Sequence, residues 1–300
     1  MMPARLKTRL VQMNVLPGRP DENTAVMLQH IDKARGDGVE LVVFPEMCIP
    51  GYLIGDEWEF HAFLRECETC AAQVCAASAG MVVIFGSVAM DWNKKNEDGR
   101  VRKFNALFVA DNGAFVGPSS SPYPFVIKTL MPNYREFDDS RHFFDLRKLA
   151  MEADKPVTDL TGPVVTSCGT LGCVICEDAW NMDYAHAPLE ALASHGVDLY
   201  VNISSSPYTF NKNHKRTRVF MDWVGRLKRP VLFVNNVGIQ NNGKTVFTFD
   251  GSSCIYDGAG NCLEATERFE SATLTAEIAP GSDRAIFDSP AAPREDTIAD

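Results

Sequence analysis

Short, nearly continuous apolar runs alternate along this chain with longer amphipathic segments. Runs of this kind are typical of β-strands that are buried on both faces; they occupy residues 8–14, 39–46, 80–88, 172–178, 196–204 and 229–238. The amphipathic periodicity between them predicts helices at residues 21–35, 57–79, 186–195 and 213–228. Strands of this type that are covered by helices form a layered α/β domain.

Two further segments predict antiparallel hairpins. Residues 104–117 place Asp-Asn-Gly between two apolar runs, and residues 247–265 show the same pattern of turn residues between apolar runs. No linker, low-complexity block or internal repeat divides the chain before its Pro-, Ala- and Asp-rich end. We therefore expect one domain at residues 1–278, followed by an extended tail at residues 279–300.

Charge and cysteine content narrow the classes of function. The 300 residues carry a formal net charge of -10 without a long basic block, so a small-molecule substrate is expected rather than nucleic acid. Nine cysteines are an odd number in a chain too large to need a disulfide scaffold, which indicates reduced thiols in a cytoplasmic protein. No segment approaches the roughly 18 apolar residues of a membrane span, and the N-terminus lacks the apolar stretch of a signal peptide. We expect neither a membrane nor a nucleic acid as a partner.

Three strand-like runs carry a reactive side chain. The run at residues 39–46 ends in Glu46, the run FVIKTLMP carries Lys128, and GCVIC ends in Cys176. Because ligands bind beyond the carboxyl ends of strands in open α/β sheets, these side chains are the first candidates for chemistry. A thiol can attack a carbonyl, a carboxylate can move its proton, and an ammonium can stabilise the oxyanion. Taken singly, each also has an ordinary explanation as a turn carboxylate, a strand-edge lysine or a small buried hydrophobe.

Two Cys-x-x-Cys spacings raise other possibilities. Cys67 and Cys70, together with Cys173 and Cys176, have the composition of a four-thiolate zinc site. Zinc pairs normally lie on tight glycine-containing turns, however, whereas the first pair falls in a predicted helix and strand alternation turns the second pair to opposite faces. We therefore expect no metal. A dithiol redox pair fails similarly, because its second cysteine should lie in a helix that starts at the first, and nothing in the sequence favours a Cys-His hydrolase.

With Glu46, Lys128 and Cys176 in this order, the chain resembles the nitrilase superfamily of carbon-nitrogen hydrolases, whose members use a Glu-Lys-Cys triad. It is most similar to the glutaminase domain of glutamine-dependent NAD synthetases. The similar segments are VVFPEMCIPGY, KTLMPNYREFDDSRHF, GCVICEDAW, VNISSSPYTFNKNHKR and VNNVGIQNNGKTVFTFDGSSCIYDGAGN. The resemblance implies an α-β-β-α sandwich of the nitrilase type at residues 1–278. It also implies a homo-oligomer, a dimer or higher, to which C-terminal arms contribute.

The resemblance also implies a mechanism. Cys176 would attack an amide carbonyl with Glu46 as the base, while Lys128 and the backbone N–H of Glu177 hold the oxyanion; ammonia would leave, and water would hydrolyse the thioester. The implied substrate-binding residues are Tyr52, Tyr134, Glu136, Glu177, Ser206 and Lys212, and the segment SSSPYTFNK permits a shift of register for the last two. Members often add a second glutamate after the lysine, and Glu136, Asp138 and Asp139 compete for that place.

The expected activity is a cofactor-free hydrolysis of the carbon-nitrogen bond of a small linear amide, glutamine or an analogue. A complete glutamine-dependent NAD synthetase continues into an ATP-using domain with a Gly-rich phosphate loop, and this sequence contains no such loop. One alternative is therefore a glutaminase-like subunit that is active only with a separate synthetase partner. Another is a nitrile or N-carbamoyl hydrolase.

A carboxylate on the substrate would need a basic partner. Lys212, Lys215, Arg216 and Arg218 are the candidates near one predicted helix start. A solvated helix face explains this cluster equally well.

Overall fold

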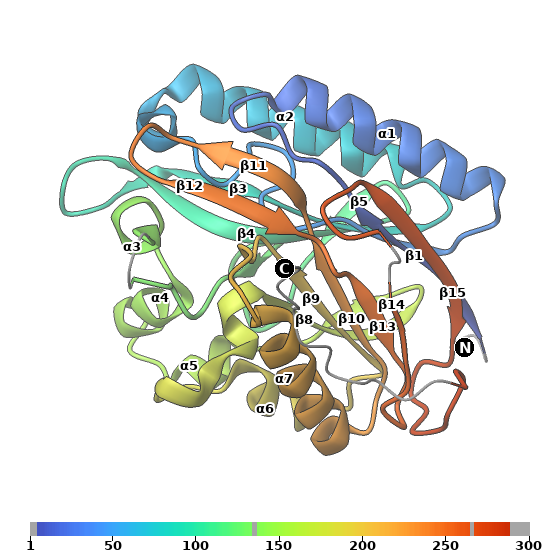
Figure 1. The fold of residues 1–300 in the computed structure, drawn as a ribbon. Helices are drawn as coiled ribbons and strands as arrows, with labels where there is room; N and C mark the ends of the chain where they lie inside the picture. Colours follow the sequence, from blue (N-terminus) through green and yellow to red (C-terminus); the bar gives the residue numbers. More distant parts are fainter. Residues whose placement is uncertain (1–4, 134–136, 265–266, 289–300) are drawn as a thin grey trace.

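The computed structural model describes residues 5–133, 137–264 and 267–288, which form two stacked β-sheets with helices on both outer faces (Figure 1). The predicted α-β-β-α sandwich is confirmed. The first sheet runs in the order β15 (Ala272–Ile278), β1 (Leu6–Gln12), β2 (Leu41–Val43), β3 (Val82–Lys95), β4 (Val101–Asp111) and β5 (Ala114–Val116), and β6 (Val126–Ile127) pairs with β4. The second runs in the order β14 (Cys262–Glu264), β13 (Cys254–Tyr256), β10 (Val231–Asn235), β9 (Leu199–Ser204), β8 (Gly169–Ile175) and β7 (Val164–Thr166).

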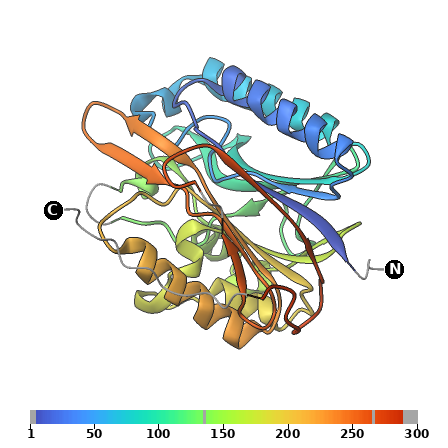
Figure 2. The same cartoon turned by 45° about the vertical axis from the view of Figure 1, so that its right-hand side comes forward.

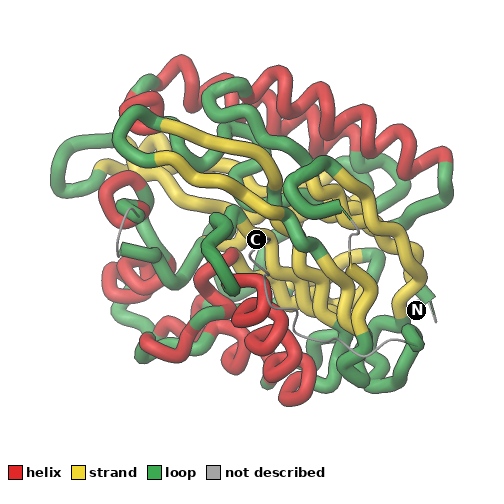
Figure 3. Tube along the Cα trace, in the orientation of Figure 1, coloured by secondary structure: helices red, strands yellow, loops and turns green. Residues whose placement is uncertain are grey.

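Helices lie outside the two sheets, which Figure 3 shows as yellow strands between red helices. The first sheet is covered by α1 (Pro20–Gly36) and α2 (His61–Ala77). The second is covered by α6 (Pro188–Ala193) and α7 (Lys212–Leu227). Short helices complete the chain: α3 (Asp139–His142), α4 (Leu146–Glu152), α5 (Val157–Leu160), and the 3-10 turns η1 (Gly55–Glu59), η2 (Cys176–Ala179) and η3 (Asn181–Asp183). Within the described ranges, no helix has both the length and the apolar character needed to cross a bilayer.

Strand alternation explains why the apolar runs are continuous. In β2, Val42 packs into the core beneath α1 and α2, whereas Leu41 and Val43 pack into the core between the two sheets. Successive side chains of a strand point to opposite faces, so a strand with an apolar layer on each side needs an apolar residue at every position. The first sheet therefore contributes to two cores at once.

The predicted helices are present, and their bounds differ for local reasons. The helix predicted at residues 57–79 is divided, because Phe60 is extended and separates η1 from α2. The strand predicted at residues 172–178 ends at Ile175, because Cys176 adopts a positive φ of 45° and begins η2. A strand cannot continue through a left-handed residue.

Of the two predicted hairpins, the first is confirmed, since β4 and β5 pair across Asn112 and Gly113, both with positive φ. Only the second half of the segment at residues 247–265 forms a hairpin, between β13 and β14. Its first half belongs to β12 (Val246–Asp250), which pairs instead with β11 (Val237–Asn241). Figure 2 shows this two-stranded ribbon extending beyond the sheets.

The tail predicted at residues 279–300 is described only as far as Asp288, and residues 289–300 lie outside the described part. Residues 279–288 contain no helix or strand. They are hydrogen-bonded to the residue that follows β13, because Asp257 Oδ2 accepts the backbone N–H groups of Ile286 at 2.6 Å and Phe287 at 3.0 Å. The domain boundary at residue 278 stays a prediction.

Candidate active site

The three reactive residues each follow the end of a strand. Glu46 follows β2, Lys128 follows β6, and Cys176 follows β8. The structure joins two of them directly, since Lys128 Nζ lies 2.8 Å from Glu46 Oε1 and neither side chain is exposed to solvent. All nine cysteines lie in the described part of the chain, and Cys176 alone is partly exposed while the other eight are buried. A reactive thiol must be accessible, so exposure singles out Cys176.

Charge connects Cys176 with the other two residues. Desolvation and the nearby Glu46 carboxylate raise the pKa of the Cys176 thiol, while Lys128 acts in the opposite direction. The thiol is therefore protonated at neutral pH and needs a base before it can act as a nucleophile.

The Glu46 carboxylate is held from several directions. Oε1 accepts a hydrogen bond from Asn105 Nδ2 at 2.7 Å in addition to that from Lys128, and Oε2 accepts the backbone N–H of Ser205 at 2.6 Å. The Ser205 hydroxyl donates to the backbone carbonyl of Glu46 at 2.8 Å. On the other side, Gly86 of β3 lies so close that a Cβ there would come within 2.5 Å of Glu46 Cα. Only glycine permits this approach.

Lys128 is bonded to a second carboxylate as well. Its Nζ lies 2.9 Å from Asp139 Oδ2, and Asp139 Oδ1 accepts the hydroxyl of Tyr52. Burial disfavours the ammonium, but the charges of Asp139 and Glu46 outweigh this effect and raise the pKa of Lys128. The pKa of Asp139 is itself raised, because burial and Glu46 outweigh the attraction of Lys128. The cluster therefore contains one cation between two carboxyl groups.

Of the two described candidates for the second acidic residue, Asp138 and Asp139, the structure brings Asp139 to Lys128. The neighbouring Asp138 is 58% exposed and points toward Arg141 and His142, each at 3.9 Å. The third candidate, Glu136, lies outside the described residues, as does Tyr134.

The turn that carries Cys176 is tied to the segment that carries Lys128. Asp178 Oδ2 accepts the backbone N–H of Ile175 at 3.1 Å, and Oδ1 accepts those of Thr129 at 3.1 Å and Leu130 at 2.7 Å. Burial raises the pKa of Asp178 to about 7, against the effect of these three donors. Neither Asp178 nor Asn105 was a candidate from the sequence. A lone polar residue in the apolar run at residues 104–110 was the available signal for Asn105.

Three of the candidate substrate-binding residues lie around the triad. The Tyr52 ring centroid is 5.7 Å from Lys128 Nζ. Glu177 follows Cys176 directly and accepts the Tyr184 hydroxyl at 2.9 Å. Lys212 donates to the Pro207 carbonyl at 2.8 Å, and burial and Arg216 lower its pKa to about 8, while Cys176, Asp250 and Glu177 oppose this.

The register of the segment SSSPYTFNK decides which of its serines contacts Glu46. The backbone N–H of Ser206 donates to Asn235 Oδ1 at 2.9 Å, and its carbonyl accepts from Asn235 Nδ2 at 3.1 Å. The preceding residue, Ser205, is the one that contacts Glu46. The structure therefore places Ser205, one residue before the predicted Ser206, in contact with Glu46.

The basic cluster on α7 divides into two pairs. Arg216 is buried and lies 3.1 Å from Asp250 Oδ1, so its charge is compensated. Lys215 and Arg218 are exposed, as expected for a solvated helix face. Lys212 is left as the inward-facing cation of this cluster, and its Nζ donates to a carbonyl rather than to a carboxylate.

The two Cys-x-x-Cys spacings belong to different layers. Cys67 and Cys70 pack between the helices and the first sheet, whereas Cys173 packs between the sheets. Over residues 5–133, 137–264 and 267–288, no group of three or more His, Cys, Asp or Glu side chains is arranged to hold a metal ion.

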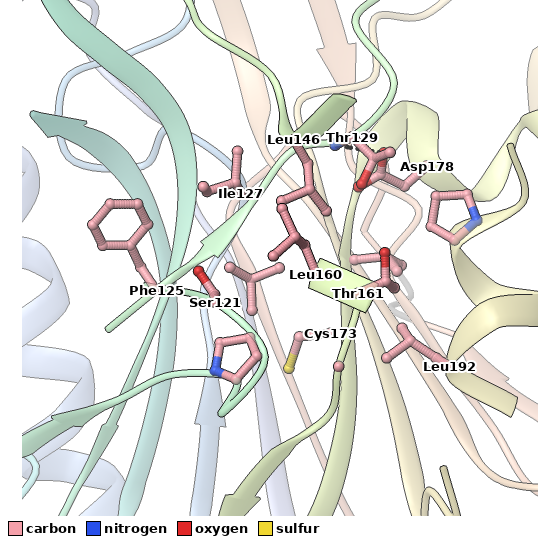
Figure 4. A pocket seen from close by; sticks show the side chains of 15 residues that line it. Ser121, Phe125, Ile127, Thr129, Leu146, Leu160, Thr161, Cys173, Asp178 and Leu192 are labelled. Atoms are coloured by element: carbon pink, nitrogen blue, oxygen red, sulfur yellow. Dashed lines mark hydrogen bonds between the residues drawn. The ribbon is translucent and has the colours of Figure 1, made fainter. Parts of the chain in front are cut away.

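Two pockets flank the cluster. One is mostly apolar and lies behind the Lys128 segment, with Thr129 and Asp178 at one end and Phe125 at the other (Figure 4). The other borders Tyr52 and Asp139 and is lined by aromatic side chains, including Trp58 and Phe247. The first pocket therefore borders the residues on either side of Lys128 in the chain, and the second borders Asp139.

Comparison with known proteins gives consistent matches. The family model described as carbon-nitrogen hydrolase matches residues 7–286. The glutamine-dependent NAD(+) synthetase of Xanthomonas campestris is 28% identical over 277 residues, which are 92% of this chain and 44% of that protein. The chain thus spans less than half the length of the curated relatives that it matches.

Solved structures agree on the fold. The glutamine-dependent NAD+ synthetase from Acinetobacter baumannii in complex with ADP has a TM-score of 0.72 and 25% identity, covering 91% of this chain and 45% of that chain. An amidase from Nesterenkonia sp. has a TM-score of 0.70 and 16% identity, covering 94% of this chain and 93% of that chain. These matches confirm both the resemblance drawn from the sequence and the nitrilase type of the sandwich.

Proposed function

Because the chain belongs to the carbon-nitrogen hydrolase family, we propose that it cleaves the carbon-nitrogen bond of a small linear amide through a thioester on Cys176. The observation that carries this proposal is the buried pair of Glu46 and Lys128, 2.8 Å apart, beside the one partly exposed cysteine. These groups supply a base, a cation and a nucleophile.

In the first step, Glu46 takes the thiol proton while the Cys176 sulfur bonds to the amide carbon. The π-electrons of the carbonyl move onto its oxygen, which becomes an oxyanion. Lys128 has three N–H groups, and among the described residues two of them are directed at Glu46 and Asp139. The third N–H and the backbone N–H of Glu177 then stabilise the oxyanion.

The intermediate collapses when the carbon-nitrogen bond breaks. Glu46 returns its proton to the leaving nitrogen, so ammonia departs and a thioester remains on Cys176. In the second half-reaction Glu46 takes a proton from water, which attacks the thioester carbon, and the thiolate leaves and recovers that proton. The net products are ammonia and a carboxylic acid.

Glutamine or a close analogue is the proposed substrate. Support comes from the similarity to glutamine-dependent NAD synthetases and from Lys212, an inward-facing cation whose interaction with Cys176 indicates a place near the thiol. Lys212 would receive a substrate carboxylate, and Glu177 would receive an amine. Tyr52 would pack beside the substrate while its hydroxyl stays on Asp139.

A second candidate is a glutaminase-like unit that works only with an ATP-using synthetase and passes ammonia to it. It is favoured by the curated relatives, which are glutamine-dependent NAD(+) synthetases more than twice as long as the matched region. Homo-oligomerisation and a cytoplasmic location stay predictions, and light scattering of the purified protein tests the first.

Ammonia release from glutamine tests the proposal, with Cys176→Ala as the blank and circular dichroism as the check that the variant is folded. The panel includes a neutral amide, a nitrile and an N-carbamoyl amino acid. Cys176-dependent release from glutamine supports the leading proposal, whereas undiminished release by Cys176→Ala removes the thiol from the mechanism. Release that appears only when an ATP-dependent NAD synthetase is added favours the second candidate. Turnover of the nitrile or carbamoyl compound alone replaces amide hydrolysis with that activity.

A further inference from the structure

Asn105 contacts both partners of the buried Glu46–Lys128 pair. It lies on β4, is fully buried, and donates from Nδ2 to Glu46 Oε1 at 2.7 Å. Its backbone carbonyl accepts the backbone N–H of Lys128 at 3.0 Å. Asn105 thus fixes the Glu46 carboxylate and the backbone at Lys128 relative to each other.

The hydrogen bonds distinguish the two oxygens of Glu46. Each carboxylate oxygen has about two lone-pair sites. Oε1 accepts from both Asn105 and Lys128, so both of its sites are in use. Oε2 accepts from the Ser205 backbone N–H, which leaves one site for a proton.

The other end of the Asn105 amide indicates why the residue is there. Its Oδ1 is buried and has no hydrogen-bond partner among the residues that the structure describes. An unpaired buried polar atom is unfavourable for folding. The side chain is therefore explained by what its NH2 group does for Glu46, rather than by a contribution to the fold.

We propose that Asn105 is a positioning residue that occupies Glu46 Oε1 and so reserves Oε2 as the atom that receives the Cys176 proton. This inference rests on the proposed function, in which Glu46 is the base. Without Asn105, Oε1 regains a free site, and the proton can go to Oε1 instead of Oε2. The carboxylate also loses a donor that favours its ionised form.

Other charged groups face Glu46 as well. Lys128 at the end of β6 bonds to it, while Asp139 on α3 and Cys176 on η2 interact with it electrostatically. Asn105 is a neutral donor in this set. Its removal therefore changes hydrogen bonding without changing the number of charges.

The test replaces Asn105 by Leu, which has a similar volume and no polar side-chain atoms. Asn236→Leu is the matched control: Asn236 is equally buried, its Oδ1 also lacks a partner among the described residues, and its NH2 goes to Ser205 Oγ at 3.3 Å rather than to the carboxylate. Measurements are kcat, KM, and the pH dependence of kcat/KM. The rate of Cys176 alkylation by iodoacetamide is also measured against pH and followed by peptide mass spectrometry.

In Asn105→Leu we expect kcat to fall by about 10- to 100-fold with KM nearly unchanged. The acidic limb of both pH profiles should move to higher pH by about half a unit or more, whereas the limbs of Asn236→Leu stay in place. Asn105→Ser, whose side chain is too short to reach Glu46, should behave like Asn105→Leu and serves as the second variant if leucine disrupts folding. If the acidic limbs of both pH profiles stay at the same pH as in the unmodified protein in both Asn105 variants, the proposal is overturned.

The alkylation profile separates this inference from the proposed function. It needs only Cys176 and its base, and no amide turnover. If the unmodified protein hydrolyses no amide, a limb shift confined to the Asn105 variants still supports the positioning role, while the hydrolase proposal fails. If hydrolysis is strong and neither profile moves, the hydrolase stands and the positioning role is wrong.

Discussion

Asp178 Oδ1 accepts the backbone N–H of Leu130 at 2.7 Å, so a carboxylate two residues after Cys176 is bonded to the chain two residues after Lys128. The same carboxylate also accepts the N–H of Ile175, just before Cys176. The distance between the Cys176 turn and the Lys128 segment, the proposed nucleophile and cation, therefore depends on one buried side chain.

We predict that Asp178→Asn destabilises the protein and lowers kcat. Asparagine keeps one acceptor oxygen for the Lys128 segment but directs an NH2 group at the Ile175 N–H, which loses its partner. An unsatisfied buried donor costs about 1–3 kcal/mol, and denaturant unfolding measures this loss. Asp183→Asn on the exposed face of η3 is the control and should change stability by less than about 0.5 kcal/mol. Equal stability and kcat in Asp178→Asn and the unmodified protein would contradict the prediction.

We predict that Asp178 makes stability fall as pH rises from about 4 to about 7. Burial raises the pKa of Asp178 to about 7 in the folded protein, compared with about 3.9 for an unfolded aspartate. Between these values the native state holds a proton that the unfolded state has lost, so a pH increase favours unfolding by up to about 1.4 kcal/mol per unit. Unfolding free energy measured across this window should fall more steeply for the unmodified protein than for Asp178→Asn. Parallel slopes would show that Asp178 does not titrate there.

We predict that Lys128→Met destabilises the protein by about 3–5 kcal/mol, because it leaves Glu46 and Asp139 buried without their cation. Adding Asp139→Asn should recover part of this loss, since one of the two uncompensated carboxyl groups is then removed. Activity should stay low in both variants, as the oxyanion loses its cation.

Lys103→Met is the control for Lys128→Met. Lys103 is a buried lysine on β4, and its Nζ pairs with Glu59 at 2.9 Å rather than with Glu46. The Lys103→Met variant should be less stable than the unmodified protein but retain its kcat per folded molecule. A Lys128→Met variant that retains kcat would remove Lys128 from the proposed mechanism.

We predict that binding of a carboxylate-bearing amide weakens as pH rises through about 8. Burial and Arg216 lower the pKa of Lys212 to about 8, so the side chain is charged below this pH and neutral above it. KM for glutaramate, which has the carboxylate but no amine, should therefore rise across this range, while KM for butyramide should not. In Lys212→Met, KM for glutaramate should be about 10- to 100-fold higher at neutral pH and lose this pH dependence. Lys215→Met, on the exposed side of α7, is the control and should resemble the unmodified protein.

The layered fold could be predicted because its signal is local. Strands buried on both faces, such as β2 and β9, need apolar residues at consecutive positions, so short segments of the sequence already reveal them. The bounds were less predictable where a single residue changes direction. Cys176, for example, ends β8 by its positive φ, and a cysteine does not announce that conformation in the sequence.

The sequence by itself determined the layered α/β character and the identity of Glu46, Lys128 and Cys176 as candidates, since these follow from residue type and position within short segments; the resemblance to the nitrilase superfamily implied the sandwich. Only the tertiary structure decided which polar atoms meet them. Asn105 is 59 residues from Glu46 in the chain, Ser205 is 159 residues from it, and Asp178 is 48 residues from Leu130. A hydrogen bond forms only near 3 Å, so these partners depend on how β4, β6 and β8 are aligned in space. The choice of Asp139 over Asp138 has the same cause, because the two are adjacent in the sequence and only the orientation of α3 directs one of them at Lys128.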